Sequence, residues 1–149
     1  MFNRLLRAYG LAVTSIAILA GAATAVAAPA SASGGWNNTT VGPTIYQTNY
    51  WYSSNHIPAL SGTPSSPITS VYYSWKWNSA GSPPGLNVQL CDAYRCLSVP
   101  GYIASGSTSG FNGDPANTYF YFRFDAAASS TYTFSPPYYG GTDSVSVSY

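Results

Sequence analysis

Short runs of alternating apolar and polar residues recur along this chain, and each run ends in Gly, Pro, Ser or Asn. Alternation with a period of two places every second side chain on one face, which is typical of a half-buried β-strand. No apolar stripe at helical spacing interrupts these runs beyond residue 32. The pattern favours a β-sandwich or a small barrel, and we expect an all-β, single-domain antiparallel β-sandwich of about six to eight strands.

Two of the runs are strongly aromatic on a shared face. The run over 69–77 places Trp75 and Trp77 on one face, and we expect both rings to lie in the core. The run over 119–125 separates its Phe side chains from its Tyr and Arg side chains in the same way. The expected strands are 40–48, 69–77, 86–91, 96–102, 119–125 and 145–149, and the expected exposed loops are 53–67, 104–117 and 126–141.

The runs over 86–91 and 96–102 form a predicted β-hairpin whose two arms carry the only cysteines of the chain, Cys91 and Cys96. Opposite residues of an antiparallel pair have Cα atoms about 4.5 to 5.5 Å apart, within the range that a disulfide spans. Because the closed ring is short, we expect only roughly 2 kcal/mol of stabilisation from the bond. Oxidation depends on the compartment, and free thiols are the alternative.

Residues 1–32 have the pattern of an export signal. Arg4 and Arg7 precede an uncharged, mostly apolar stretch over 11–28, and small residues at 30–32 suit signal peptidase. The pattern therefore predicts export, to the periplasm or outside the cell.

Two alternatives to cleavage after residue 32 remain. One is an earlier cut after the Ala-Val-Ala motif at 25–27, and the other is an uncleaved membrane anchor. The stretch is rich in Ala, Thr, Ser and Gly and is therefore only weakly hydrophobic for a spanning helix. No later segment has the length to span a bilayer, so we expect one domain over 33–149 and, after export, a Cys91–Cys96 disulfide.

The expected domain carries few charges and no Glu. Its three basic and four acidic residues give a formal charge of −1, without any run of Lys or Arg. Nucleic acids and anionic membrane surfaces require several cationic contacts, so both are disfavoured as partners. The charged residues are Lys76, Arg95 and Arg123 against Asp92, Asp114, Asp125 and Asp143.

Catalytic and metal-binding motifs are weak in this sequence. The single His, His56, has no accompanying motif that supplies a nucleophile and an orienting acid. The Asp residues are scattered, and Asn112-Gly113-Asp114 is explained as a turn without calcium. Two cysteines and one His do not make a zinc site. We expect no enzymatic activity, cofactor or metal.

Aromatic residues are the remaining distinctive feature, with four Trp and fourteen Tyr in the chain. Clusters at 50–52 and 138–139 fall in expected loops. Surface aromatics anchor protein partners and also offer flat faces to sugars, so they leave protein and glycan recognition open. The alternative is that they fill a core that is poor in Leu and Ile.

The order of several short motifs along the domain is a further signal. In chain order the motifs are Gly35-Trp36, Val41-Gly42, Trp75 and Trp77 before a Pro-Gly turn, Gly85-Leu86, Val88-x-Leu90-Cys91, Arg95-Cys96 and Val145-x-Val147-x-Tyr149. In this order they resemble the FlhE family of flagellar proteins, over nearly the whole of the expected domain. The most specific part is the hairpin with Arg95 directly before Cys96. The chain departs from the family in its low charge and its richness in Tyr and Ser.

The resemblance implies a small exported β-sandwich of the periplasm, accessory to flagellar assembly and without enzymatic activity. It implies binding to a flagellar rod, hook or export component in a chaperone or sealing role. The alternative is a secreted carbohydrate-binding or cell-surface interaction module. Arg95 either contacts the partner or, as we favour, pairs with Asp92 across the hairpin turn. The candidate partner-binding residues are Trp36, Trp51, Tyr52, Arg95, Tyr138 and Tyr139.

Overall fold

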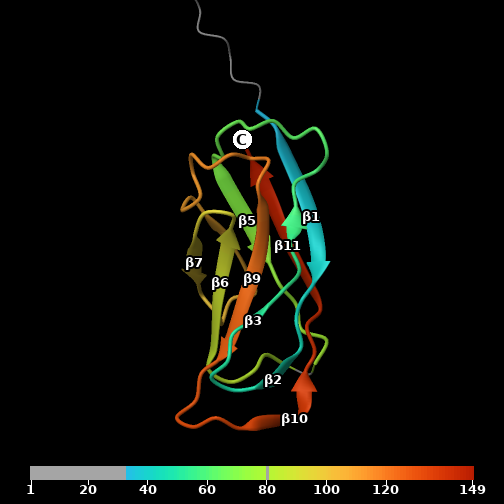
Figure 1. Cartoon of the computed structure of the whole chain (residues 1–149), viewed down its shortest axis with the longest axis vertical. Coiled ribbons are helices and arrows are strands. Elements are labelled where there is room, and N and C mark those ends of the chain that lie inside the picture. Colours follow the sequence, from blue (N-terminus) through green and yellow to red (C-terminus); the bar gives the residue numbers. More distant parts are fainter. Residues whose placement is uncertain (1–32, 80) are drawn as a thin grey trace, which may run out of the picture. The chain divides into compact units, whose positions relative to one another are not determined.

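In this computed structural model, which describes residues 33–79 and 81–149, eleven β-strands pair antiparallel throughout (Figure 1). In chain order the strands are β1 (Gly35–Val41), β2 (Ile45–Gln47), β3 (Tyr52–Ser53), β4 (Ile57–Pro58), β5 (Ser70–Ser74), β6 (Leu86–Asp92), β7 (Cys96–Val99), β8 (Ser105–Thr108), β9 (Tyr119–Ala126), β10 (Thr133–Tyr138) and β11 (Thr142–Ser148). The expected export signal lies outside the described residues.

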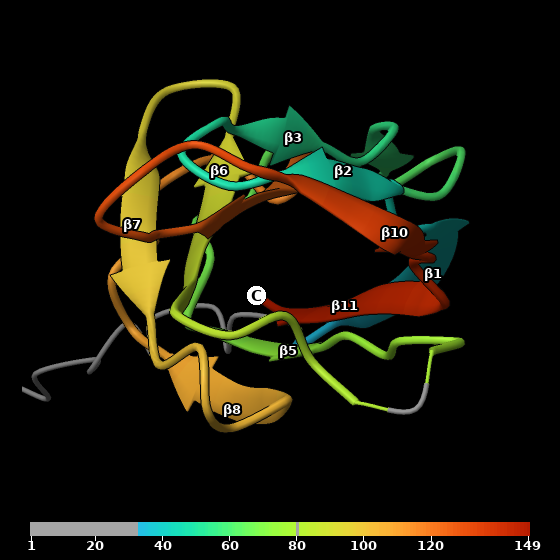
Figure 2. The same cartoon turned by 90° about the horizontal axis from the view of Figure 1, so that it is seen from below.

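The strands form two larger sheets and a short ribbon. One sheet has the order β1-β11-β5-β8, and the other has the order β3-β9-β6-β7 with β4 also paired to β9. The ribbon joins β10 to β2. Figure 2 shows β5, β8 and β11 in one layer and β3 and β6 in the other. The predicted antiparallel β-sandwich is confirmed, with more strands than expected.

The extra strands come from segments that lack a clear alternation. The expected strand over 40–48 is two strands, β1 and β2, separated by Gly42, Pro43 and Thr44. Proline has no N–H for a ladder and favours such a break. Each of the three expected loops also contains a short strand, namely β4, β8 or β10. These strands are two to six residues long, and their sequences are polar or rich in Pro.

Aromatic rings fill the space between the two larger sheets. Trp36 of β1 is 5% exposed, and its ring centroid lies 6.1 Å from that of Phe120 on β9. Its indole N–H donates a hydrogen bond to the carbonyl oxygen of Ala116 at 2.8 Å. Phe111 meets Phe120 edge-on at 5.1 Å. Offset and edge contacts of this kind stabilise aromatic cores.

Trp75 and Trp77 follow β5 and face the core, as expected. Trp75 is 3% exposed and makes edge contacts with Phe122 at 5.9 Å and Phe124 at 6.2 Å between ring centroids. Trp77 is half-buried and meets Phe124 edge-on at 5.3 Å. The three Phe side chains of β9 are buried, so β9 supplies the aromatic centre of the core.

The β6–β7 hairpin has the predicted register. Cys91 lies opposite Cys96, the two form a disulfide, and their Cα atoms are 4.0 Å apart. Gly85 precedes β6 with a φ of +63°, and a Cβ there would lie 2.3 Å from the carbonyl oxygen of Ala127. Only Gly fits this turn without displacing backbone. The disulfide prediction is confirmed.

Among the residues that the structure describes, no helix has the length and apolar character needed to cross a membrane.

Candidate partner-binding surfaces

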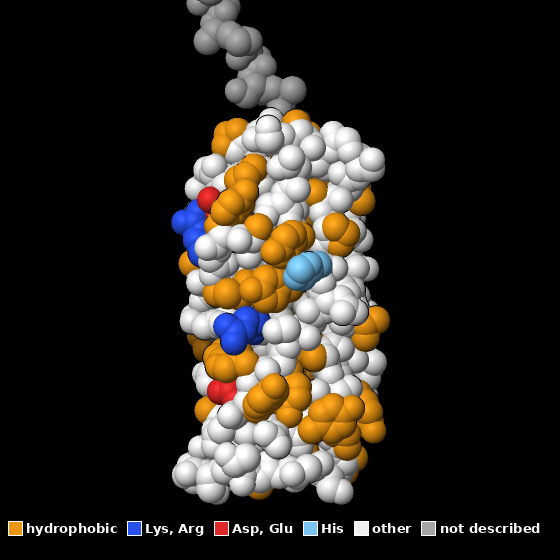
Figure 3. All heavy atoms as spheres, viewed as in Figure 1, with side chains coloured by type: hydrophobic (Ala, Val, Ile, Leu, Met, Phe, Trp, Pro, Cys, Tyr) orange, Lys and Arg blue, Asp and Glu red, His pale blue; other side chains and the backbone are white. Residues whose placement is uncertain are grey.

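A cluster of ring side chains covers the solvent side of β9. Tyr119, Tyr121 and Arg123 alternate along β9 with the buried Phe side chains, so they point away from the core. Trp51 and His56, which flank β3, lie against them. Figure 3 shows hydrophobic side chains gathered on this face among basic side chains and the single His. We call these five residues the β9 outer face.

Contacts within the β9 outer face hold its rings in place. The guanidinium carbon of Arg123 lies 4.9 Å from the centroid of the Trp51 ring, a cation–π arrangement. Arg123 also donates a hydrogen bond from Nη1 to Oε1 of Gln89 at 3.3 Å. The imidazole of His56 stacks on the Tyr119 ring, with 4.1 Å between centroids and 16° between planes. The face is therefore a surface of half-buried Tyr and Trp rings with an exposed His ring stacked on it.

Tyr52 of β3 lies among other Tyr rings. Its ring centroid is 5.0 Å from that of Tyr50 and 6.3 Å from that of Tyr46. The Tyr52 hydroxyl accepts a hydrogen bond from the backbone N–H of Gln47 at 3.2 Å. Tyr52 is half-buried, whereas Tyr46 and Tyr50 are 55% and 56% exposed. The structure thus presents the neighbours of Tyr52 more openly than Tyr52 itself.

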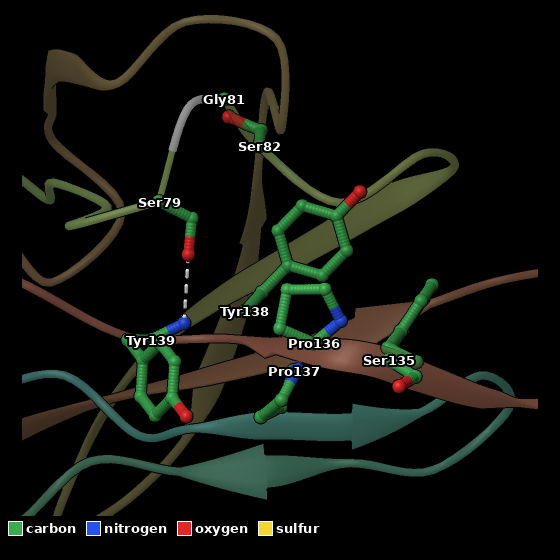
Figure 4. A pocket seen from close by; sticks show the side chains of 9 residues that line it. Ser79, Gly81, Ser82, Ser135, Pro136, Pro137, Tyr138 and Tyr139 are labelled. Carbon is green, nitrogen blue, oxygen red and sulfur yellow. Dashed lines mark hydrogen bonds between the residues drawn. The ribbon is translucent and has the colours of Figure 1, made fainter.

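A second surface is a groove of about 590 Å³ between β10 and the segment that follows Trp77. We call it the β10 groove, and Figure 4 shows its lining side chains. The carboxyl-terminal half of β10 forms one wall and a Ser-containing segment forms the other (Figure 4). The lining residues are Ser79, Gly81, Ser82, Phe134, Ser135, Pro136, Pro137, Tyr138 and Tyr139.

The walls of the β10 groove are fixed by specific contacts. The Tyr138 ring meets Phe134 edge-on with 4.9 Å between centroids, and both rings pack against the core. The backbone N–H of Tyr139 donates a hydrogen bond to Oγ of Ser79 at 2.9 Å (Figure 4). Tyr139 itself is 52% exposed. The peptide bond between Ser135 and Pro136 is cis.

Two of the candidate partner-binding residues make contacts within the fold: Trp36 is buried, and Arg95 is exposed but paired. Trp36 lies in the core, so its indole ring does not face a partner. The Arg95 guanidinium forms an ion pair with Asp114, with Nε and Oδ2 at 3.0 Å. The expected side-chain pair between Arg95 and Asp92 is wrong, because the hairpin places Asp114 of another segment within reach of Arg95.

Asp92 stabilises the hairpin turn through the backbone. Its Oδ1 accepts hydrogen bonds from the backbone N–H groups of Tyr94 at 2.9 Å and Arg95 at 2.8 Å. Such a carboxylate takes the place of a backbone acceptor in a tight turn. The role of the Asp92 carboxylate is therefore to stabilise the hairpin turn.

The potential catalytic and metal-binding groups are dispersed. The His56 ring contacts two Tyr rings, and within residues 33–79 and 81–149 no carboxylate is hydrogen-bonded to it. The same ranges contain no group of three or more His, Cys, Asp or Glu side chains arranged to hold a metal ion. Asp114 lies at the expected turn, and its carboxylate pairs with Arg95.

Asp143 is a buried carboxyl that the sequence analysis did not single out. It is 1% exposed, and its Oδ2 has no hydrogen-bond partner among the described residues. Burial away from water raises its pKa to about 8, because the charged form is poorly solvated there. The signal was present in the sequence, since Asp143 shares the period of two with Val145 and Val147.

The fold and surfaces define a class: a disulfide-linked antiparallel β-sandwich with aromatic side chains on its surface. The family model for "Flagellar protein FlhE" matches residues 42–149, so the chain belongs to the FlhE family and is a flagellar-associated protein. A crystal structure of FlhE is similar to this chain with a TM-score of 0.71 and 26% identity, covering 78% of this chain and 96% of that one. No curated protein matches the chain. The disulfide indicates an oxidising compartment.

Proposed function

We propose that this protein is an exported, non-enzymatic accessory of the flagellar system that binds a rod, hook or export component. In this role it acts as a chaperone or seal for the flagellar assembly or export apparatus. Membership of the FlhE family supports the flagellar setting. The proposal adds the mode of action, which is recognition of a protein partner by an aromatic surface.

The β9 outer face is the observation that carries this proposal. Tyr119 and Tyr121 present rings on the solvent side of β9, and Trp51, which directly precedes β3, lies against Arg123 of the same strand. Rings with few rotatable bonds lose little entropy when a partner covers them, and Tyr, Trp and Arg dominate the energetics of protein interfaces. Arg123 and Trp51 already hold each other, so the surface is organised before binding.

Site-specific photocrosslinking in a flagellated host that carries the gene tests the proposal. A photoreactive phenylalanine replaces Tyr121 on the β9 outer face or, as the matched control, Tyr72 on β5. Tyr72 is 49% exposed and lies on the other sheet, so crosslinks from this position measure non-specific contacts. We expect position 121 alone to yield a covalent product with a flagellar rod, hook or export protein.

A motility assay provides the second arm. Deletion of the gene is expected to impair motility, and the wild-type gene is expected to restore it. The paired variant Trp51→Ala with Tyr121→Ala should restore motility poorly, whereas Tyr72→Ala should restore it fully. Products at position 121 that contain only non-flagellar proteins, together with normal motility of the deletion strain, would contradict the proposal.

Residues 1–32 are proposed to direct export and to be removed. Arg4 and Arg7 before an apolar stretch support this assignment, and the Cys91–Cys96 disulfide is consistent with an oxidising compartment. Mass spectrometry of the protein recovered from the periplasm or the medium should give a mature start at Ser33. Recovery of the intact chain from the membrane fraction would instead indicate an uncleaved anchor.

A secreted carbohydrate-binding module is the second candidate function. The open rings of Tyr46 and Tyr50 favour it, because flat exposed aromatics are suited to stacking on sugar rings. Retention on an insoluble polysaccharide that is lost in Tyr50→Ala and kept in Tyr72→Ala would support this candidate. Equal retention of both variants, or none, would remove it.

A further inference from the structure

We infer that the β10 groove binds an uncharged, proline-containing peptide segment in the polyproline II conformation. The inference rests on the proposed function, in which this protein binds a protein component of the flagellar system, and it names the kind of segment that the groove takes. Polyproline II segments have three residues per turn, no internal hydrogen bonds and free carbonyl groups. Each of these properties has a counterpart in the groove.

The charge of the groove restricts its ligand. No charged side chain belongs to the described lining, which consists of Ser, Gly, Phe, Pro and Tyr. A charged ligand would lose its hydration there without gaining an ionic partner. The groove therefore favours a segment without Lys, Arg, Asp or Glu, and its affinity should depend little on salt.

The backbone of β10 limits how a peptide is held. Pro136 and Pro137 lie in the wall of the groove and have no N–H groups. Strand β10 pairs with β2 at Thr133 and Tyr138, and the register shifts between these two positions. An added β-strand requires regular backbone donors and acceptors along its new neighbour. This part of β10 does not provide them, so recognition has to come from side chains.

Hydroxyl groups supply the missing donors. Oγ of Ser79 accepts the Tyr139 N–H, which leaves the Ser79 hydroxyl hydrogen available to donate to a ligand. Ser82 and Ser135 are exposed at the rim of the same groove. The carbonyl groups of a polyproline II segment are acceptors without internal partners, so they match these hydroxyl donors.

Apolar rings supply the packing surface. Figure 4 shows the Tyr138 ring and the Pro136 ring, both of which line the groove. Tyr138 is held against Phe134 and the core, so it is a rigid surface. Aromatic-lined grooves bind proline-rich segments in this way, and the preformed shape of the ligand keeps its entropy loss small.

Titration of the purified protein, expressed from the full chain, with an acetylated and amidated decaproline peptide tests the inference. NMR spectra of the protein should show saturable shifts of the amides of Ser79, Ser82 and Tyr139, with no change at β8. The affinity should be about the same in low and high salt. A neutral glucose oligosaccharide of similar length is the comparison probe, and we expect it to cause no saturable shift.

Two variants and one control locate the site. Tyr139→Ala and Ser82→Trp, both at exposed positions, should weaken decaproline binding about fivefold or more, the effect of about 1 kcal/mol. Tyr72→Ala removes a similarly exposed Tyr from β5, away from the groove, and should leave the affinity unchanged. Thermal melting of each variant confirms that it folds.

Absence of saturable shifts, or equal affinity of Tyr139→Ala and the wild type, would overturn the inference. Saturable shifts with the oligosaccharide alone would assign the groove to glycans instead. Failure of the peptide arm does not decide the proposed function, because crosslinking from position 121 reports the partner independently. If crosslinking to a flagellar component fails while decaproline binds in the groove, the proposed partner is wrong and the groove specificity remains.

Discussion

The guanidinium of Arg95 pairs with the carboxylate of Asp114, which lies 19 residues further along the chain. Arg95 belongs to the turn between β6 and β7, and Asp114 belongs to the segment between β8 and β9. That segment is itself fixed by two backbone hydrogen bonds: the Ile68 N–H donates to the carbonyl oxygen of Asp114, and the Gly113 N–H donates to the carbonyl oxygen of Ile68. The ion pair therefore links the disulfide hairpin to a part of the chain that does not share its strands.

Loss of this ion pair should have a small effect on stability. The Arg95 side chain is 43% exposed and that of Asp114 is 18% exposed, so water screens their attraction. We expect Asp114→Asn to lower the free energy of unfolding by about 0.2–1 kcal/mol, measured by urea denaturation. The difference in stability between the variant and the wild type should shrink in 1 M salt, because the Debye length there is only about 3 Å. A larger, salt-independent loss would show that Asp114 acts through the turn.

Removal of the Asp92 carboxylate should cost more. Asp92 is buried, and its Oδ1 accepts two backbone N–H groups in the hairpin turn. Asp92→Ala leaves both donors without that acceptor, so we expect a loss of about 1–3 kcal/mol in urea unfolding. Asp92→Asn keeps an acceptor oxygen of the same shape and should lose less. Equal losses in the two variants would mean that charge, and not the acceptor, is what the turn requires.

The stability of the protein should fall as pH rises from about 4 to about 8, because of Asp143. In the folded protein burial raises the pKa of this carboxyl from 3.8 to about 8. Between these values the folded chain holds a proton at Asp143 that the unfolded chain has released. The contribution of Asp143 is therefore fully present below about pH 4 and is lost as pH rises through about 8.

Thermal melting across this pH range measures the effect. The wild type should lose on the order of a few kcal/mol, visible as a falling melting temperature, with little further change from this group above its folded pKa. Asp143→Asn has nearly the same size but does not titrate, so its melting temperature should depend less on pH and exceed that of the wild type at pH 8. Parallel curves for the two proteins would show that Asp143 is not the group responsible.

The alternation of apolar and polar residues along the sequence predicted those strands that bury one face against the core. The hairpin of β6 and β7 and the aromatic strand β9 were found in this way, because their apolar side chains report which face is covered. Strand β8, with the sequence Ser-Gly-Ser-Thr, has no apolar side chain to show a period. Strand β10 contains two Pro residues and was expected to be a loop.

The surfaces were harder to predict, because they depend on contacts between distant segments. The high content of aromatic residues in the sequence did not show that Trp36 packs against Phe120 or that Arg123 lies over Trp51. The partner of Arg95 was also mistaken, since the sequence offered Asp92 nearby and gave no sign of Asp114. Pairings of this kind are set by the packing of sheets, and a pattern along one strand does not encode them.

Reduction of the Cys91–Cys96 bond should weaken the protein without unfolding it. The bond closes a ring of only six residues, so in the chain-entropy description it contributes roughly 2 kcal/mol. Without the disulfide, the hairpin still has the backbone pairing of β6 with β7 and the turn that Asp92 stabilises, because neither involves the sulfur atoms. We expect the variant with Cys91→Ala and Cys96→Ala to retain its β-sheet circular dichroism spectrum and to unfold at lower urea concentration. A reducing agent should shift the wild type to the same midpoint and leave the variant unchanged, whereas complete unfolding of either one would show that the core cannot support the fold without this bond.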